Sequence, residues 1–497
     1  MARDLARNSL SVLLLLAVAL AMLVPALHAS FRSDHHSARA FFYSALILMV
    51  LGGFVAIVQR GRPAPRDPAR SLLGVLVLSY GILPLAMLLP LAQALPDQPL
   101  LDLWFEMVSA YTTTGATLFD PGALAPSLHL WRALVGWMGG FVMLVAAGAI
   151  LAPLNLGGWE VMSGRVPGRR MDGLTPNGAM QDPTLRLMAQ ARQVLLLYSG
   201  ATVLLWLGLS LAGERGLVAF CHALGGISTS GISPIGGLQG AAAGRWGEIC
   251  LMLAAGTALS RRAWPGIPSL ARPSPLWRDA ELRLASAVLA GTVIALALRY
   301  GIWGAPIGDL AAAGRSLWGA LFTATSFLTT TGYVSADWAQ TGRATGLATP
   351  GLLLAGLAIM GGGIATTAGG VKLLRIHALF RHGAQEMDRL IHPHAVAGPG
   401  LPREGAFVAW IAFMLFALSI AVGLAALTLA GEGFDQALAL TLSALTTTGQ
   451  LAGMVHAPLA YPDLAGATKL ILGGLMVLGR LELLALLVLL MPGRGQR

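Results

Sequence analysis

The chain has 497 residues, of which 56% are hydrophobic and 11% are charged, and its formal net charge is +10. This length would allow two or three soluble domains, but so apolar a composition excludes them and indicates a protein surrounded by lipid. The two cysteines are too few for a framework of disulfide bonds.

Ten apolar segments have a length suited to crossing a bilayer, although the sixth is short and the eighth is interrupted by glycines. The first follows Arg3 and Arg7, as in a signal peptide. It is long and ends without a convincing cleavage pattern, so we expect a retained membrane helix. The segments lie at about 9–29, 40–59, 70–92, 131–153, 192–212, 246–262, 284–303, 349–380, 405–430 and 466–491.

Positive charge gathers in alternate loops, which the positive-inside rule assigns to the cytoplasm. Ten spans then place both termini in the cytoplasm. This pattern predicts a multi-pass protein in contact with the lipid bilayer and binding no nucleic acid. The basic residues of these loops are Arg60, Arg62, Arg66, Arg70, Arg165, Arg169, Arg170, Arg186, Arg192, Arg261, Arg262, Arg272, Arg278, Arg283, Lys372, Arg375, Arg381, Arg389 and Arg403.

Four short runs of threonine and serine, each ending on glycine, recur at intervals of roughly a hundred residues between apolar segments. Polar backbone at such places must be buried or face water. Four such runs predict four equivalent loops around one axis, as an ion pore requires. The alternative for each run is a helix-packing contact, in which threonine and glycine are common. The runs are 112–115 (TTTG), 228–231 (STSG), 329–332 (TTTG) and 446–449 (TTTG).

A short amphipathic segment precedes each run, at 103–108, 217–220, 317–322 and 434–438. At this length the segments cannot cross a bilayer, so we expect half-helices that dip in from outside. Their partly negative C-terminal ends then point to the membrane centre and favour a cation. Backbone carbonyls can ligate a dehydrated alkali ion, and glycine permits the positive φ that such a loop needs. The hydroxyls of Thr113, Thr114, Thr330, Thr331, Thr447 and Thr448 can add oxygens or brace the loop.

Glu106, Asp337 and Asp435 flank the predicted outer mouth, where carboxylates would concentrate cations. The alternative is that they are ordinary solvated loop acids.

Glycines interrupt the eighth span on both sides of residues 364–368. So many glycines disfavour a continuous helix, by roughly 1 kcal/mol each relative to alanine. We expect a flexible loop beneath the four runs that obstructs the pore; the alternative is a glycine-rich helix contact. Arg480 lies within the last span, where an arginine normally faces protein or water. It predicts an electrostatic barrier in the pore, or else an ion pair with another span, because Glu482 points to a different helix face.

Several stretches in order resemble the Trk/Ktr/HKT superfamily of potassium transporters, and most closely its bacterial TrkH type. They are YTTTGAT at 111–117, ISTSGIS at 227–233, TTTGYVSADW at 329–338, GGGIATTAGGVKLLR at 361–375 and GRLE at 479–482. The resemblance implies an all-α membrane protein with four membrane–pore loop–membrane repeats around a central pore and two extra N-terminal transmembrane helices. On this chain the extra helices would occupy 1–69, and the repeats 70–160, 161–265, 266–385 (with the gating loop) and 386–497.

The resemblance also implies functional residues. The potassium filter would consist of Thr113, Thr114, Gly115, Thr229, Ser230, Gly231, Thr330, Thr331, Gly332, Thr447, Thr448 and Gly449. The gate would consist of Gly361, Gly362, Gly363, Thr366, Thr367, Gly369, Gly370 and Arg480. Ser230 and the fourth run depart from the usual pattern, in which the fourth run is rich in asparagine. All four glycines are retained, which favours potassium, while the fourth run leaves the ratio of potassium to sodium open.

The sequence therefore predicts a potassium-uptake protein of the bacterial inner membrane, with K⁺ as the transported ion and no organic cofactor. No nucleotide-binding loop motif and no catalytic constellation occurs in the chain, so we expect no enzyme activity. The resemblance implies a homodimer and a cytoplasmic TrkA-type regulatory subunit that binds nucleotide. The alternative is a sodium- or proton-coupled secondary cation transporter working by symport. It would need ionisable residues at mid-membrane, of which few exist besides Arg480 and Glu482.

Overall fold

The computed structural model describes residues 10–59, 68–163, 167, 183–264, 275, 278–303, 310–339, 341, 350–392, 403–456 and 459–490. Within these ranges the chain is helical and forms no strand, which confirms the predicted all-α membrane protein. Seven of the described helices are long and apolar enough to cross a membrane, and a bent helix pair would make an eighth. Basic residues at 60, 62, 66, 165, 169, 170 and 272 lie outside the described residues, as does the side chain of Arg403. The predicted sidedness therefore stays a prediction.

The helices differ widely in length, because several end inside the bundle. Single turns of 3₁₀-helix, η1 (Pro121–Ala123), η3 (Arg261–Ala263) and η5 (Tyr461–Asp463), lie in the connections. The longer elements are α2 (Leu10–Phe31), α3 (His35–Gln59), α4 (Pro68–Met87), α5 (Leu89–Ala94), α6 (Leu100–Tyr111), α7 (Pro126–Ala146), the π-helical turn η2 (Ala147–Leu151), α8 (Trp159–Ser163), α9 (Pro183–Leu211), α10 (Gly216–Ser228), α11 (Gly244–Gly256), α12 (Ala280–Trp303), α13 (Leu310–Leu328), α15 (Pro350–Met360), α16 (Leu373–Ile391), α17 (Arg403–Leu429), α18 (Phe434–Leu445), α19 (Leu451–Val455), α20 (Gly466–Leu481) and α21 (Leu483–Leu490).

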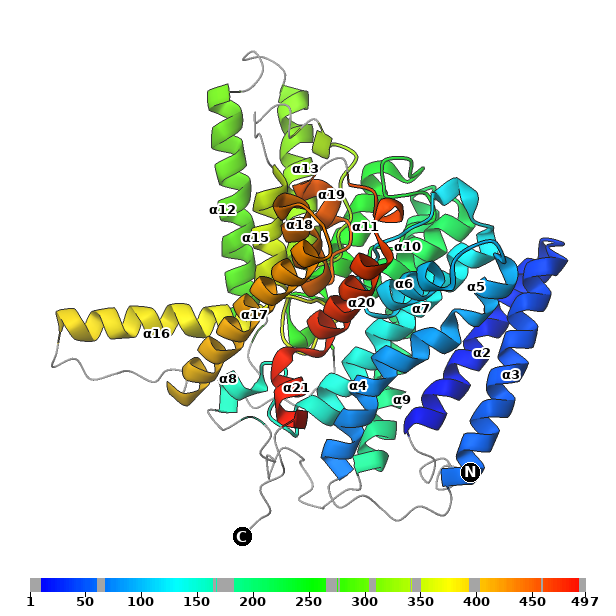
Figure 1. Ribbon diagram of the computed structural model, residues 1–497. Coiled ribbons are helices and arrows are strands. Elements are labelled where there is room, and N and C mark those ends of the chain that lie inside the picture. Colours follow the sequence, from blue (N-terminus) through cyan, green and yellow to red (C-terminus); the bar gives the residue numbers. More distant parts are fainter. Residues whose placement is uncertain are drawn as a thin grey trace, which may run out of the picture.

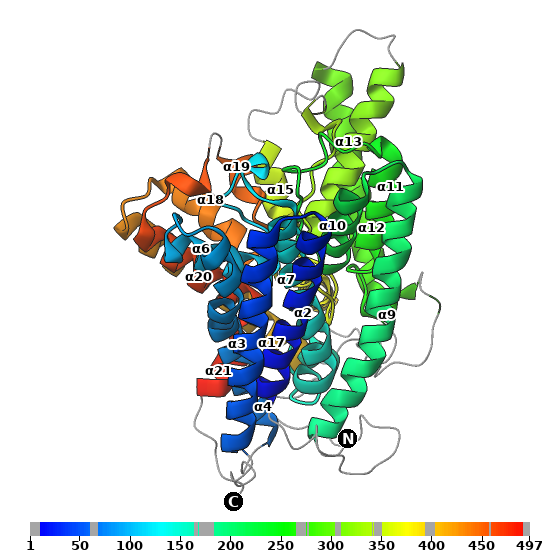
Figure 2. The same ribbon diagram turned by 90° about the vertical axis from the view of Figure 1, so that its right-hand side faces the viewer.

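The first two helices form an antiparallel hairpin on one side of the bundle (Figures 1 and 2). Ser33 makes the turn with a φ of 59°, and the carboxylate of Asp34 accepts a hydrogen bond from Ser37 N at 3.1 Å at the start of α3. The outward face of α3 is apolar, and Phe54 and Val58 are 64% and 65% exposed. Such a face is stable only in lipid or against another protein.

Short helices fill the centre of the bundle. α6, α10 and α18 have 12, 13 and 12 residues, too few to cross a bilayer, and their second halves are buried. α13 is longer than expected, with 19 residues. α7 lies beside α6 and α10, and glycine allows this close approach, because a Cβ on Gly139 would overlap the Tyr111 carbonyl at the end of α6. The centre thus consists of half-helices packed by longer neighbours.

Two of the expected spans do not continue as straight helices. The eighth, predicted for 349–380, ends as a helix at Met360 and continues as non-helical chain to Lys372. α16 then leaves the bundle at a steep angle to α12 (Figure 1), and it carries charged residues along its length, so it does not continue the span. The last, predicted for 466–491, is bent by 90° between α20 and α21. Glu482, with a φ of 60°, makes this break.

The sixth expected span, 246–262, is α-helical only up to Gly256, where the 13-residue helix α11 ends. Two helices far apart in the sequence, α4 and α21, lie in contact. Arg70, at the start of α4, donates hydrogen bonds to the carbonyls of Val488 and Leu489 in α21, at 2.8 and 3.1 Å. The beginning of the first predicted repeat therefore lies beside the end of the fourth.

Candidate functional site

The helix before each of the four polar runs ends in the same way. The second residue of every run is a threonine in the left-handed conformation, although a β-branched residue there is strained by about 1–2 kcal/mol. The amide after it bonds the carbonyl five residues back, the Schellman pattern in which glycine normally takes the left-handed position. The φ values are 58° for Thr113, 54° for Thr229, 56° for Thr330 and 54° for Thr447. The Schellman bonds run from Thr114 N to Ser109 O, Ser230 N to Gly225 O, Thr331 N to Ser326 O and Thr448 N to Ser443 O, at 2.8–3.0 Å.

The first and third hydroxyls of each run brace it. The first hydroxyl donates to a carbonyl of its own half-helix four residues back, at 2.7–2.9 Å. The third hydroxyl bonds the first in three runs, as between Thr112 and Thr114 at 2.8 Å, and in the fourth run Thr448 donates to Thr446 O at 3.2 Å. These oxygens are therefore occupied by the turn itself.

The second hydroxyls behave differently. Those of Thr113, Thr229 and Thr447 are buried and have no hydrogen-bond partner among the described residues. The Thr330 hydroxyl accepts a hydrogen bond at 2.7 Å from Gly369 N, in the interrupted span. A buried hydroxyl without a partner costs about 1–3 kcal/mol. The three unpaired threonine oxygens are therefore available to ligate a cation.

The glycines that end the runs lie in a closed ring. A Cβ on Gly115 would clash with the carbonyl oxygen of Ser230, and one on Gly231 with that of Thr331. A Cβ on Gly332 would lie 3.2 Å from the Thr448 methyl group, and Gly449 N donates to Thr114 O at 2.6 Å. Each run therefore lies against the next, and the fourth returns to the first.

The fourth glycine corrects one expectation. Gly115, Gly231 and Gly332 have φ values of 74°, 60° and 81°, as the sequence predicts. Gly449 does not have a positive φ. Glycine is required there because a Cβ would overlap the backbone nitrogen of Ala116 in the first run.

Side chains of the half-helices hold the chain just after the ring. Glu106 Oε2 accepts from Leu118 N at 3.0 Å, and Thr323 Oγ1 accepts from Ser335 N at 3.2 Å, in both cases 12 residues apart. Glu106 is 1% exposed and pairs with Arg132 at 2.5 Å, so its expected place at the outer mouth is wrong. α6 buries this side chain against the chain that follows the first run.

Glu248 holds the chain after the third run in the same way. This residue was not predicted from the sequence. Its carboxylate accepts from Trp318 Nε1, Ser335 Oγ and Ala336 N at 2.5–2.9 Å. Of the other expected mouth acids, Asp337 pairs with the exposed Arg245 at 3.0 Å and Asp435 is exposed in the first turn of α18.

The interrupted span forms a non-helical loop packed closely against its neighbours. Gly361 and Gly370 have φ values of 71° and 76°, and a Cβ on Gly361 would overlap the backbone of Gly369 and Gly370. Cβ atoms on Gly362 and Gly363 would lie 2.5 and 2.7 Å from the carbonyl oxygens of Ala258 and Leu259. These glycines therefore let the backbone of the loop approach the backbone at Ala258 and Leu259.

Hydrogen bonds fix both sides of this loop. Glu281 Oε1 accepts from Ile364 N at 2.7 Å, and the Thr366 hydroxyl donates to Gly363 O at 2.8 Å. On the other side Gly369 N reaches the Thr330 hydroxyl, as described above. The loop thus contacts the third run directly.

Two buried arginines near the loop have different environments. Arg375, at the start of α16, bonds Glu160 of α8 and Glu482 of the α20–α21 break, both at 2.7 Å. Arg480 is 3% exposed and donates to Thr367 O at 2.6 Å. Its Nε and Nη2 have no hydrogen-bond partner in the described part of the chain, and no described carboxylate pairs with it. Its charge beside the loop is therefore not neutralised by an ion pair there.

The sequence identified the four runs, the loop and Arg480, and the structure brings all of them together. Besides Glu248, it missed Glu160, Glu281 and Gln450. Gln450 follows the fourth glycine, and its Nε2 lies 2.9 Å from Gly231 O. An amide directly after a run was a visible signal, whereas the two glutamates had no local pattern that could have revealed them.

Comparison with known proteins gives a consistent result. Residues 282–493 match the TrkH family model, described as a cation transport protein. The chain is 31% identical over 410 residues to the Trk system potassium uptake protein TrkH of Halomonas elongata, covering 79% of this chain and 78% of that protein. It is 29% identical to the TrkH of Vibrio parahaemolyticus, covering 97% of each. The crystal structure of the potassium transporter TrkH from Vibrio parahaemolyticus superposes with a TM-score of 0.80, at 25% identity, over 99% of both chains.

Replacing the hydroxyl that holds the loop tests its contact with the third run. We expect Thr330→Val to raise hydrogen–deuterium exchange in peptides covering 361–372, since Gly369 N–H loses its acceptor. Thr428→Val is the matched control, because that exposed hydroxyl bonds only its own helix. Equal exchange in both variants would contradict the contact.

Proposed function

The chain belongs to the TrkH family, and on this premise we propose that it takes up potassium across the bacterial inner membrane through a channel-like pore. The observation that carries the proposal is the ring of four turns with strained threonines and unpaired buried hydroxyls. The relatives reported above are named as potassium uptake proteins. Four repeats, 70–160, 161–265, 266–385 and 386–497, each contribute one turn in this proposal.

The filter of the proposed pore combines backbone carbonyls with the second hydroxyl of each run. Carbonyls replace the water around a dehydrated alkali ion without a fixed charge that would trap it. The half-helices α6, α10, α13 and α18 end at the runs, so the negative ends of their dipoles face the ring. Both features favour a monovalent cation. The filter residues are Thr113, Thr114, Gly115, Thr229, Ser230, Gly231, Thr330, Thr331, Gly332, Thr447, Thr448 and Gly449.

The gate of the proposed pore is the loop at 361–370 together with Arg480. The bond from Gly369 N to the Thr330 hydroxyl supports this role, because the loop takes up an oxygen that an ion could otherwise use. Arg480 adds a positive charge at Thr367 O that opposes a passing cation. Opening then requires both groups to move away from the ring.

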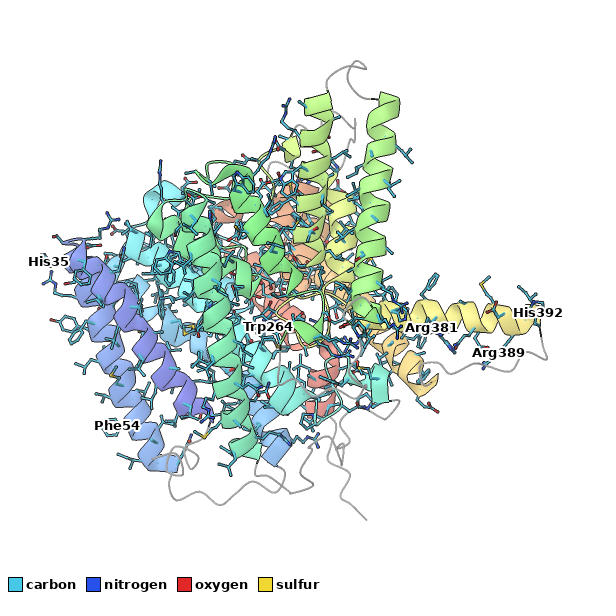
Figure 3. The ribbon with its side chains drawn as sticks, turned by 180° about the vertical axis from the view of Figure 1, so that it is seen from behind. His35, Phe54, Trp264, Arg381, Arg389 and His392 are labelled. Carbon is cyan, nitrogen blue, oxygen red and sulfur yellow. The ribbon has the colours of Figure 1, made fainter. Side chains whose placement is uncertain are left out.

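We infer two protein partners: a second copy of the chain and a cytoplasmic TrkA-type subunit that binds nucleotide. α16 supports the first, since it projects from the bundle (Figure 3) with Phe380, Met387 and Leu390 exposed by 74%, 63% and 83%. Apolar side chains exposed in this way mark a contact surface. The second rests on the resemblance to Trk systems and on the lack of a nucleotide-binding loop motif in the sequence.

A carboxylate placed in the ring tests the filter. We expect Gly332→Asp to reduce potassium-dependent growth and rubidium uptake to the level of cells without the protein. The new side chain would collide with Gln450, and its fixed negative charge would trap the cation. Gly240→Asp is the control, since nothing lies within 4 Å of a Cβ there. Growth of the Gly332→Asp strain at low potassium would reject the filter assignment.

Removing the unpaired charge tests the gate. We expect Arg480→Ala to raise basal rubidium flux into proteoliposomes roughly tenfold, the effect of a barrier lowered by about 1.4 kcal/mol. Arg480→Lys keeps the charge and should keep the low basal flux. Equal flux in all three proteins would remove Arg480 from the gate.

Molar mass in solution tests the partners. Light scattering of the purified chain should give twice the monomer mass, and Leu390→Asp should lower it, since a charge then lies in the apolar contact. Gln385→Asp, on the same helix, serves as the control. Adding a TrkA-type subunit should give a larger complex; a monomer that binds no such subunit would refute both inferences.

A further inference from the structure

One side chain reaches across the ring of glycines. Gln450 directly follows Gly449, and its Nε2 donates to Gly231 O at 2.9 Å and to Gly115 O at 3.4 Å. A Cβ on Gly332 would meet its amide oxygen. A single residue of the fourth turn therefore contacts the other three.

The equivalent residues of the other turns do nothing similar. Ala116, Ile232 and Tyr333 follow the first three glycines, and all are buried. The Tyr333 hydroxyl donates to Ile232 O at 2.9 Å, which is a brace after the ring and not a contact with a glycine carbonyl. Among these four positions only Gln450 brings a polar group to the carbonyls of the ring.

The chemistry of the amide suits the place of a cation. Its NH₂ group carries partial positive charge and supplies two donors, and it sits between two carbonyl oxygens from different turns. The amide oxygen is buried and has no hydrogen-bond partner in the described residues. The reverse orientation would set oxygen against oxygen at both carbonyls, so the contacts fix which atom faces the ring.

We propose that Gln450 is a specificity-determining residue of the filter, whose amide NH₂ replaces a cation in the empty ring and whose amide oxygen ligates the ion in the occupied ring. The proposal rests on the proposed function. An entering alkali ion displaces the NH₂ from Gly115 O and Gly231 O, and rotation of the amide gives its unpaired oxygen a partner.

Two consequences follow for the ion. Binding has to compete with two hydrogen bonds, which raises the concentration needed for occupancy. In the occupied ring the reach of the amide oxygen is set by the Gln450 side chain, so a smaller, sodium-sized ion is ligated less well by it. Removal of the side chain should therefore reduce discrimination.

Replacing Gln450 by glutamate distinguishes competition between the NH₂ group and the ion from a role of the side chain in packing alone. Gln450→Glu keeps the shape but cannot donate to the carbonyls, and it offers charged oxygens to the ion. In thermal unfolding of the full chain, with choline chloride exchanged for potassium chloride at constant ionic strength, the half-saturating potassium concentration should fall about tenfold relative to wild type. Gln98→Glu, at an exposed turn, is the control and should leave it unchanged.

Alanine tests discrimination independently, and it also serves if the glutamate variant does not fold. In proteoliposomes Gln450→Ala should lower the ratio of rubidium to sodium flux at least about threefold, while Gln98→Ala keeps the wild-type ratio. An unchanged potassium titration in Gln450→Glu, or an unchanged flux ratio in Gln450→Ala, overturns the assignment.

The two measurements also distinguish the proposal from its premise. Wild-type protein without rubidium flux above empty liposomes would refute the proposed function, whereas the unfolding titration needs no transport. No stabilisation by potassium in either wild type or Gln450→Glu would overturn the role of Gln450 itself.

Discussion

Satisfying polar backbone at the centre of an apolar bundle is the constraint on which this structure depends. Four half-helices end inside the bundle, and their last carbonyls and the turns that follow have no lipid partner available. Schellman bonds, the first hydroxyl of each run and bracing groups such as Glu106 and Glu248 meet this need. Among the hydroxyls that they leave without a partner in the described residues are those of Thr113, Thr229 and Thr447 in the runs themselves. In the proposed pore these three oxygens face the path of the ion.

The four turns share the left-handed threonine but carry unequal side chains. The first and second turns keep a free second hydroxyl, the third gives its hydroxyl to the loop at Gly369, and the fourth adds an amide through Gln450. A pore built from one chain can carry different side chains in each of its four turns, whereas a pore built from four identical subunits cannot. In the proposed pore, the contact with the gate and the amide ligand therefore belong to different turns.

Local patterns predicted much of this architecture. Runs of apolar residues located α2, α3, α7, α9, α12 and α17, and short amphipathic segments before polar runs located the half-helices. The glycines predicted the interruption after Met360, but the departure of α16 and the break at Glu482 were not predictable, because hydropathy does not reveal where a positive φ turns an apolar segment. The partners of Glu106 and Arg375 were hidden for another reason. Arg375 meets Glu160 and Glu482, 215 and 107 residues away, and no sequence spacing encodes such contacts.

The charges around the loop explain why Arg480 stays unpaired. Glu482 is the nearest carboxylate in sequence, but the break in the helix turns it to Arg375, which it shares with Glu160. A buried arginine between two carboxylates is costly to separate, about 3–5 kcal/mol for loss of one partner. This cluster ties the first turn of α16 to α8 and to the α20–α21 break. In the proposed gate, a partner that displaces α16 therefore pulls on the end of the loop and on the helix that carries Arg480 at the same time.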